Sequence, residues 1–333
     1  MLPAIVRKLG KSAARLVPHI DRAFAERDRL RQELGELRAE RDRLNHIVYH
    51  AEQLNKAAPQ WVPAGHFYSA IPLLSEIHRD YARIFRDLRE VSAIDLDEPG
   101  QLALLEELKG HYKEMDFPEH RQPYRRYWFE NPAYSYSDAI FLHCMIRQAK
   151  PKRLIEVGSG YSSAMTLDTN ELHFGDRIQC TFIEPYPELL LSLIRPADRE
   201  RVEIVPTRVQ DVPVERFEAL EAGDILFIDS THVARAGGDV NYLYFEVLPA
   251  IRPGVLVHIH DIFIGFQYPR PWIEEGRSWS EAYVLRAFLM YNERFRIRAF
   301  NSFIQHFHED WFTREMPLCL RNRGGSIWLQ RVR

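Results

Sequence analysis

The segment Glu156-Val-Gly158-Ser-Gly160-Tyr-Ser162-Ser163 joins an apolar run to a helical pattern. The run Arg153–Val157 predicts a buried β-strand. Glycines at a strand-to-helix turn let a ligand approach the backbone amides that are freed at the helix N-terminus. A dinucleotide fingerprint requires Gly or Ala where Ser163 stands. Glu156 suits a cationic amino-acid group better than a pyrophosphate, so the turn predicts a ligand other than NAD; a tight turn without a ligand is the alternative.

Strand and helix patterns alternate beyond this turn. Four further apolar runs predict buried strands, namely Cys180–Ile183, Val202–Val205, Ile225–Ile228 and Val255–Ile259. Helical stretches of roughly 10 to 20 residues separate most of them, which indicates a parallel sheet with helices on both faces. A helix over Glu281–Asn292 precedes two final strands, Phe295–Phe300 and Ser326–Gln330, which we expect to pair antiparallel at one edge. Before the first strand we expect a helix over Ala139–Ala149, capped by Ser137 or Asp138.

Acidic residues follow two of these strands. Glu184 closes the second strand, where a carboxylate commonly accepts both ribose hydroxyls of a nucleoside. Asp211, in Gln210-Asp211-Val212 after the third strand, is placed to reach an adenine amino group. A surface acid or a helix cap is the alternative for each. Together the two acids predict a nucleoside site at the carboxyl end of the sheet.

In this order and spacing the motifs EVGSGYSS, FIEP, QDV, DILFIDSTH and GVLVHIHD resemble the core of class I S-adenosylmethionine-dependent methyltransferases. The segments GHFYS, NPAYSYSDA and Trp279–Asn292 resemble one bacterial branch of that superfamily, whose members often carry a coiled-coil leader. The resemblance covers about residues 60–333. It implies an α/β, Rossmann-like, doubly wound sheet of seven mostly parallel strands with an antiparallel last hairpin.

The resemblance also implies S-adenosylmethionine as the cofactor. The residues it assigns to cofactor binding are Glu156, Gly158, Gly160, Ser162, Glu184, Asp211 and Asp229. Glu156 and the two glycines would hold the methionine part, Glu184 the ribose and Asp211 the adenine. Ser162 stands where many relatives have a third glycine, and we expect it to narrow the turn without abolishing binding.

The fourth and fifth strands end in Asp229 and in His260-Asp261. Carboxyl ends of neighbouring parallel strands lie together, so these three side chains can converge on one cation. The arrangement resembles catechol-type, metal-dependent O-methyltransferases, which use oxygen ligands for Mg²⁺. His260 departs from that set and shifts the expectation towards Mn²⁺, Fe²⁺ or Zn²⁺, or to no metal.

His232 follows Asp229 by three residues, at an offset where the catechol-type pattern has a basic residue. We expect His232 to be the general base and Asp229 to be catalytic with it, because an imidazole pKa of about 6.5 suits proton removal from a hydroxyl. The alternative is a loop histidine. His306 and His308 are expected on a strand, where they would cover the site formed by the strand ends.

Aromatic residues in segments flanking the strand ends are expected to wall an acceptor pocket. The candidates are His66, Tyr68, Tyr136 and Tyr268. They suit an aromatic lid or a platform on which a sugar stacks. Packing between the helical leader and the sheet is an equal alternative.

The leader, residues 1–58, differs from the rest of the chain. Residues 1–59 hold 12 Lys/Arg against 8 Asp/Glu, although the whole chain has a net charge of -3. Leu30, Leu34, Leu37, Leu44 and Val48 alternate in steps typical of a coiled coil, so we expect a homo-oligomer. Residues 1–20 form a basic end, for which contact with a membrane surface is the weaker interpretation.

Three parts are expected: the leader 1–58, a helical lid over 59–150 and a methyltransferase domain over 151–333. The near-neutral charge argues against a nucleic-acid binder. Three scattered cysteines and the lack of an apolar leader core favour a cytoplasmic protein. We expect methylation of a small-molecule or glycan hydroxyl. A non-catalytic cofactor-binding assembly module is the second hypothesis, and Glu156 and Ser163 disfavour the third, an NAD-dependent oxidoreductase.

Overall fold

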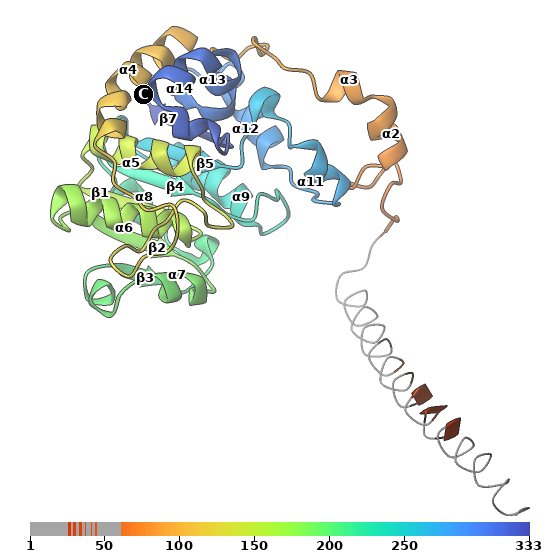
Figure 1. Cartoon of the computed structure of the whole chain (residues 1–333). Helices are drawn as coiled ribbons and strands as arrows, with labels where there is room; N and C mark the ends of the chain where they lie inside the picture. The colour runs from red at the N-terminus through yellow and green to blue at the C-terminus, as the bar shows by residue number, and fades with distance from the viewer. Residues whose placement is uncertain are drawn as a thin grey trace, which may run out of the picture. The chain divides into compact units, whose positions relative to one another are not determined.

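A computed structural model describes residues 61–333 and nine residues of the leader, namely 26, 27, 29, 30, 33, 34, 37, 41 and 44. The chain divides into two units, Met1–Ser69 and Ala70–Arg333 (Figure 1). The nine leader residues are helical, and Leu30, Leu34, Leu37 and Leu44 are 48% to 63% exposed. The predicted basic end, residues 1–20, and Val48 lie outside the described residues.

The second unit is built on a seven-stranded sheet of order β3-β2-β1-β4-β5-β7-β6. Its strands are β1 (Arg153–Val157), β2 (Gln179–Ile183), β3 (Glu203–Val205), β4 (Ile225–Ile228), β5 (Leu256–His260), β6 (Phe295–Phe300) and β7 (Ser326–Arg331). The first five pair in parallel, and β7 runs antiparallel to both β5 and β6. The predicted fold is confirmed, and each strand end lies within one residue of its expected position.

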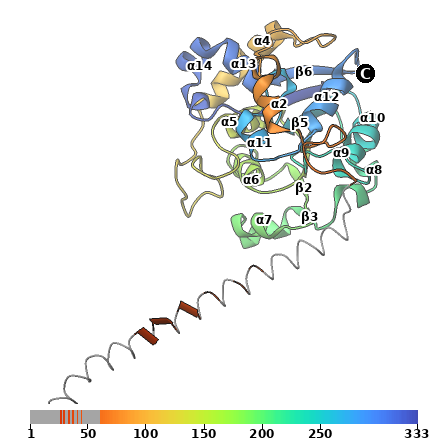
Figure 2. The same ribbon diagram turned by 90° about the vertical axis from the view of Figure 1, so that its right-hand side faces the viewer.

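Helices cover both faces of this sheet, as expected for a doubly wound fold. The α-helices of the second unit are α2 (Leu74–Arg79), α3 (Tyr81–Ile84), α4 (Glu98–Lys113), α5 (Ser137–Ala149), α6 (Tyr161–Phe174), α7 (Glu188–Leu193), α8 (Glu215–Glu218), α9 (Asp239–Tyr242), α10 (Leu248–Ala250), α11 (Arg270–Glu274), α12 (Glu281–Leu289), α13 (Asn301–Phe307) and α14 (Glu309–Glu315). Among them, α2 and α3 have no buried residue and lie apart from the sheet (Figure 1). Figure 2 views the sheet from its side, with α5, α6 and α7 on one face and α8, α9, α10 and α12 on the other.

The core lies between the central strands and these two helical layers. Every residue of β4 and β5 is buried, because helices cover a parallel sheet on both sides. The helix α4 adds Leu104, Leu105 and Leu108 to the same core and packs against α5. Burying a side chain of this size contributes about 1.5–3 kcal/mol. The segment from Ala70 to Lys150 is therefore continuous with the sheet domain.

Three local predictions differ from the structure. The helix expected over Glu281–Asn292 ends at Leu289, since Tyr291 is left-handed (φ 56°) and its amide donates to Ala93 O. The helix expected from Ala139 begins at Ser137, so Asp138 lies inside it rather than capping it. His306 and His308 are not on a strand: His306 lies on α13 and His308 follows it.

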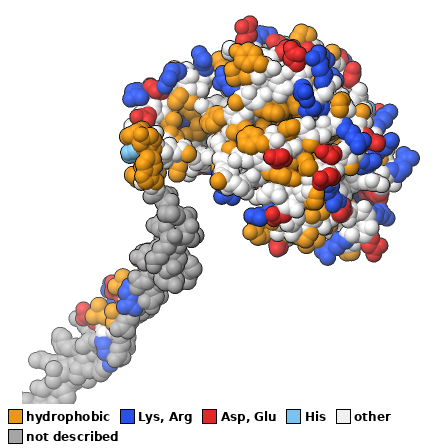
Figure 3. Space-filling view, turned by 180° about the vertical axis from the view of Figure 1, so that it is seen from behind, with side chains coloured by type: hydrophobic (Ala, Val, Ile, Leu, Met, Phe, Trp, Pro, Cys, Tyr) orange, Lys and Arg blue, Asp and Glu red, His pale blue; other side chains and the backbone are white. Residues whose placement is uncertain are grey.

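The surface of the second unit carries both signs of charge. In Figure 3, Lys and Arg side chains are interspersed with Asp and Glu side chains over the visible face. Such mixing is typical of a globular protein surface. Among the described residues, no helix combines the length and the apolar character needed to cross a bilayer.

Candidate active site

The turn between β1 and α6 brings the glycine motif against the end of β4. Gly158 adopts a left-handed backbone (φ 80°), and a Cβ atom there would collide with the carbonyl oxygen of Asp229. The Gly158 amide donates to Ile183 O at 3.0 Å, and the Asp229 amide donates to Val157 O at 2.9 Å. Only glycine fits this position, which fixes Asp229 beside the turn.

Glu156 lies fully buried beneath this turn. Its Oε1 atom accepts hydrogen bonds from the hydroxyls of Ser162 at 2.5 Å and Ser163 at 2.9 Å. Its Oε2 atom is buried without a partner among the described residues. Burial raises the pKa of Glu156 to about 8. Ser162 thus orients the carboxylate as well as occupying the turn, and the unpartnered oxygen suits a cationic donor group.

A cavity of about 340 Å³ opens beside this turn, at the carboxyl ends of the central strands. Gly158, Glu184 and Asp229 line it. The two carboxylate oxygens of Glu184 accept from the amides of Ser159 at 3.3 Å and Tyr186 at 2.8 Å, so the acid is held at the rim. The position and size of the cavity suit a nucleoside ligand.

Asp211 does not line this cavity. It is exposed and forms an ion pair with Arg208, whose Nε lies 2.8 Å from Asp211 Oδ2. Its neighbour Gln210 does line the cavity, as does Arg208. The adenine role of Asp211 stays a prediction, and Gln210 is a second residue of the same motif that can contact the base.

Asp229, His260 and Asp261 come together as predicted from neighbouring strand ends. Each offers a ligand atom within 4.8 Å of the others. His260 Nδ1 lies 3.3 Å from Asp229 Oδ1 and 3.7 Å from Asp261 Oδ2. Ligands about 2.1 Å from a metal ion are roughly 3.0–3.4 Å apart. The Asp229–His260 separation lies in this range and the His260–Asp261 separation is slightly longer, so small side-chain movements would let the set hold a divalent cation. Asp229 also lines the nucleoside cavity and joins the two sites.

Asp138 supports His260 from the other side. His260 Nε2 lies 3.5 Å from Asp138 Oδ2, and Asp138 also accepts from Ser326 Oγ at 2.6 Å and from the Gly325 amide at 3.0 Å. Burial opposes ionisation of Asp138, but these contacts outweigh it and lower the pKa. The sequence pattern offered Asp138 only as a helix cap, so its contact with His260 was missed.

His232 lies against the same two acids. Its Nε2 atom is 3.3 Å from Asp229 Oδ1 and 3.4 Å from Asp261 Oδ2, and its Nδ1 atom is 2.8 Å from Glu281 Oε2. Burial lowers the pKa of His232, but the hydrogen bonds to Asp229 and Glu281 outweigh it and raise the pKa to about 10. Without a competing cation at the acids, His232 therefore holds a proton.

Three other histidines, His258, His306 and His308, make contacts outside the cluster of Asp229, His260 and Asp261. His258 packs between Phe227 and Trp328 in the core, where burial lowers its pKa to about 3 and keeps the ring neutral. His306 and His308 pair with Asp87 and Glu98 at 3.5 Å and 2.7 Å. The strand expected for this pair was wrong, and its closing over the site stays a prediction.

The predicted pocket aromatics are spread over the chain. Tyr268 is buried beside Trp279, and its hydroxyl accepts from the Ala282 amide at 3.0 Å. Tyr136 stacks on Phe129, with its hydroxyl 2.5 Å from Glu130 Oε1. His66 and Tyr68 belong to the first unit, where the Tyr68 amide donates to His66 Nδ1 at 3.2 Å. Their contribution to an acceptor pocket stays a prediction.

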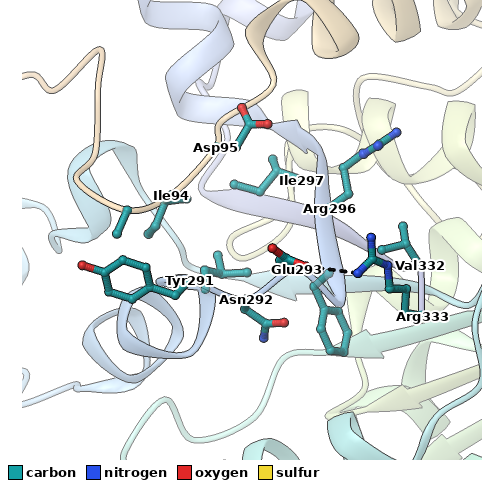
Figure 4. A pocket seen from close by; sticks show the side chains of 12 residues that line it. Ile94, Asp95, Tyr291, Asn292, Glu293, Arg296, Ile297, Val332 and Arg333 are labelled. Carbon is teal, nitrogen blue, oxygen red and sulfur yellow. Dashed lines mark hydrogen bonds and ion pairs between the residues drawn. The ribbon is translucent and has the colours of Figure 1, made fainter.

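A second cavity, of about 430 Å³, lies at the β6 edge and shares no lining residue with the first. Figure 4 shows that Ile297 of β6 lines one side of this cavity, and that Tyr291 and Ile94 line it from the adjoining loops. An ion pair between Glu293 and Arg333, 3.1 Å long, lies at its wall. No histidine lines it, so it does not share the chemistry of the strand-end site.

A glycine turn after β1, acids after β2 and β4, and the 3-2-1-4-5-7-6 sheet define a class I nucleoside-binding methyltransferase fold. The family model described as a methyltransferase domain matches residues 155–262, a segment that contains all of the candidate cofactor residues. The chain belongs to this family of S-adenosylmethionine-dependent methyltransferases.

Known relatives resemble the chain to different degrees. An uncharacterized protein of Archaeoglobus fulgidus is 34% identical over 179 residues, covering 53% of this chain and 80% of that protein. The O-methyltransferase TomG of Streptomyces achromogenes, solved with SAM, is 14% identical, with a TM-score of 0.40 over 78% of this chain and 96% of that chain.

A Podospora anserina methyltransferase solved with SAH is 13% identical, with a TM-score of 0.39 over 82% of this chain and 99% of that chain. At these identities and TM-scores, the two solved enzymes differ too much from this chain to indicate its acceptor.

Proposed function

We propose that this methyltransferase binds S-adenosylmethionine in the cavity at Gly158 and Glu184 and methylates a hydroxyl of a small-molecule or glycan acceptor. One observation carries the proposal: Asp229 lines the nucleoside cavity and also contacts His232 and His260. A base and a candidate cation site therefore adjoin the cofactor cavity. Such proximity favours transfer to an oxygen that must lose a proton.

The cofactor site is supported by the chemistry of its lining. Asp229 and Glu184 line the cavity and offer carboxylate oxygens to a sulfonium and to ribose hydroxyls. Glu156 lies buried beneath the turn, and an ammonium group at its unpartnered Oε2 atom would favour the charged carboxylate. When bound, S-adenosylmethionine supplies an electrophilic methyl group. The protein contributes by holding the acceptor oxygen in line with that group and by excluding water.

Asp229, His260 and Asp261 would hold a divalent cation. The mixed oxygen and nitrogen set favours Mn²⁺, Fe²⁺ or Zn²⁺ over Mg²⁺. When bound, such an ion lowers the pKa of a hydroxyl and fixes its orientation. It would also offset the charge of the two carboxylates that hold the proton on His232.

His232 is the proposed base. In the absence of a cation its raised pKa keeps it protonated, so it can accept a proton only when the charge of Asp229 and Asp261 is compensated. Ion binding and base function are therefore coupled through the same two acids. His232 Nε2, which faces these acids, takes the hydroxyl proton as the new carbon–oxygen bond forms.

Formation of S-adenosylhomocysteine from S-adenosylmethionine tests this function, with 3,4-dihydroxybenzoate and a short oligosaccharide as acceptor probes and Mn²⁺ or Mg²⁺ added. We expect acceptor-dependent product, and His232→Ala to lower turnover at least about 100-fold while the cofactor dissociation constant changes less than about threefold. Undiminished turnover in His232→Ala would exclude the base role.

A cofactor-binding assembly module is a second candidate, favoured by the exposed leader leucines. Tight binding of S-adenosylhomocysteine without product on any acceptor would support it. An NAD-dependent oxidoreductase is less consistent with the buried Glu156, because a pyrophosphate would meet a carboxylate. Thermal shift with S-adenosylhomocysteine against NAD distinguishes the two ligands.

The leader supports self-association as a further part of the proposal. Leu30, Leu34 and Leu37 are exposed on a helix, which leaves their apolar surface available to a second copy. Contact of residues 1–20 with a membrane surface is the weaker proposal for the basic end. Tyr268, next to Trp279, remains the best-placed of the predicted acceptor-pocket residues.

A further inference from the structure

We propose that Glu281 is the positioning residue of this site: its carboxylate fixes the imidazole of His232 so that Nε2 is the working nitrogen. The inference rests on the proposed base role of His232. Glu281 is the first residue of α12. It lies in the segment Trp279–Asn292, which resembles one bacterial branch of the methyltransferases but whose sequence pattern predicts no role for this residue. It is fully buried, and its Oε2 lies 2.8 Å from His232 Nδ1.

The same segment holds the backbone of His232. The amides of Ser280 and Glu281 both donate to His232 O, at 2.9 Å and 3.0 Å. The ring of Trp279 lies over the imidazole, with centroids 4.5 Å apart. Three consecutive residues therefore fix both the peptide and the ring of His232.

The residue that these contacts hold, His232, has an unfavourable backbone conformation. His232 has φ 60°, in the left-handed region that is unfavourable for a non-glycine residue. Residues with such a backbone conformation occur only where surrounding contacts hold the conformation in place, and they are concentrated at functional sites. The start of α12 supplies those contacts.

The hydrogen bond to Glu281 also selects the tautomer. A carboxylate only accepts, so the proton of the neutral ring lies on Nδ1 and the lone pair lies on Nε2. Nε2 faces the space between Asp229 and Asp261, 3.3 Å and 3.4 Å away. The free lone pair therefore points to the place where the acceptor hydroxyl and a cation would meet.

Burying the Glu281 carboxylate is unfavourable for folding unless an interaction with a positive charge offsets its desolvation. Glu281 Oε1 is buried without a partner among the described residues, and its only ion-pair partner in that part of the chain is His232. Burying such a charge is unfavourable without compensation. A buried carboxylate does stabilise the imidazolium that forms when His232 accepts a proton, which an amide does less well.

Two readouts test the assignment. The first is ¹⁵N NMR of the His232 ring in full-length protein with Mn²⁺ replaced by diamagnetic Zn²⁺ and S-adenosylhomocysteine added. The second is turnover of the acceptor found in the product screen. Glu281→Ala and Glu281→Gln are compared with wild type and with the control Glu293→Ala, which removes an exposed acid that pairs with Arg333.

We expect a proton on Nδ1 in wild type and in Glu293→Ala, and a shift of proton occupancy towards Nε2 in Glu281→Ala. We expect kcat to fall about 10- to 100-fold in Glu281→Ala, with partial rescue by Gln and an unchanged cofactor dissociation constant. Unchanged ring signals and kcat in Glu281→Ala would overturn the inference.

The two proposals fail in different ways. If His232→Ala keeps full turnover while Glu281→Ala changes the ring tautomer, the base role fails and the positional role of Glu281 stands. If Glu281→Ala unfolds, the tautomer in Glu281→Met decides, since methionine keeps the size of the side chain but removes the oxygen that accepts the Nδ1 proton.

Discussion

His232 Nε2 and Asp229 Oδ1 lie 3.3 Å apart, at the point where the nucleoside cavity meets the candidate cation site. His260 Nδ1 approaches the same oxygen to the same distance. Asp229 is thus shared by two imidazoles and by the cavity wall. A change at this one carboxylate should affect cofactor binding, cation binding and proton transfer together.

Asp229→Asn should abolish tight binding of Mn²⁺ and weaken the binding of S-adenosylhomocysteine. The amide removes the negative charge that both ligands require. Calorimetric titration of each ligand measures the two effects. Asp310→Asn, at an exposed position of α14, is the matched control. Retained Mn²⁺ affinity in Asp229→Asn would refute the proposed ligand set.

His260→Asp should change which cation the site prefers. An all-oxygen set favours Mg²⁺, whereas the imidazole favours Mn²⁺ or Zn²⁺. We expect the ratio of Mn²⁺ to Mg²⁺ affinity to fall about tenfold or more in the variant, measured by competition in a fluorescence titration. An unchanged ratio would show that His260 is not a ligand.

Glu156→Gln should make the apoprotein less sensitive to pH. The pKa of Glu156 is raised from 4.5 to about 8, so between these values the folded state keeps a proton that the unfolded chain has released. Wild-type stability therefore falls as pH rises through this range. The Tm of the variant relative to wild type should increase from pH 5 to pH 8, by roughly 3 °C or more.

The same variant should bind S-adenosylhomocysteine at least about tenfold more weakly, because it loses the carboxylate that we propose as the partner of the ligand's ammonium group. Glu188→Gln, at the exposed start of α7, is the control for both measurements. A constant Tm difference across the pH range would contradict the raised pKa.

The fold could be predicted because its determinants are local. Buried strands such as Ile225–Ile228 are continuous apolar runs, and the glycine turn follows from the steric demand at Gly158. The convergence of Asp229 and Asp261 followed from the parallel arrangement of their strands. These features depend on patterns that a sequence displays directly.

Glu281 and Asp138 could not be found in this way. Glu281 reads as an ordinary acid in the first turn of a helix, and Asp138 reads as a cap. Their roles arise from burial against His232 and His260, which are 49 and 122 residues away in sequence. The strand expected at His306 was wrong because Phe303, Ile304 and Phe307 pack at helical spacing.

Arg126→Ala should destabilise the second unit. Arg126 is buried and pairs with Asp168 at 2.7 Å and Asp198 at 2.5 Å. Removing one partner of a buried ion pair leaves uncompensated charge and costs about 3–5 kcal/mol. Chemical denaturation measures the loss, with Arg208→Ala as an exposed control. A loss equal to that of the control would show that the buried network contributes little.

Leu34→Glu combined with Leu37→Glu should convert an oligomer to a monomer. The two leucines are exposed on the leader helix, and charge there would repel a second copy. Light scattering after size exclusion gives the mass, with Glu33→Gln as the control. An oligomer of unchanged mass would place the self-association surface elsewhere.

The central claim is that one strand-end site holds S-adenosylmethionine beside a cation and an imidazole base. Anomalous diffraction from crystals grown with Mn²⁺ and S-adenosylhomocysteine tests it most directly. We predict a manganese peak bounded by Asp229, His260 and Asp261, with the cofactor ribose at Glu184 and its sulfur on the Asp229 side. A cofactor bound away from Glu184, or no peak between the three ligands, would contradict the account.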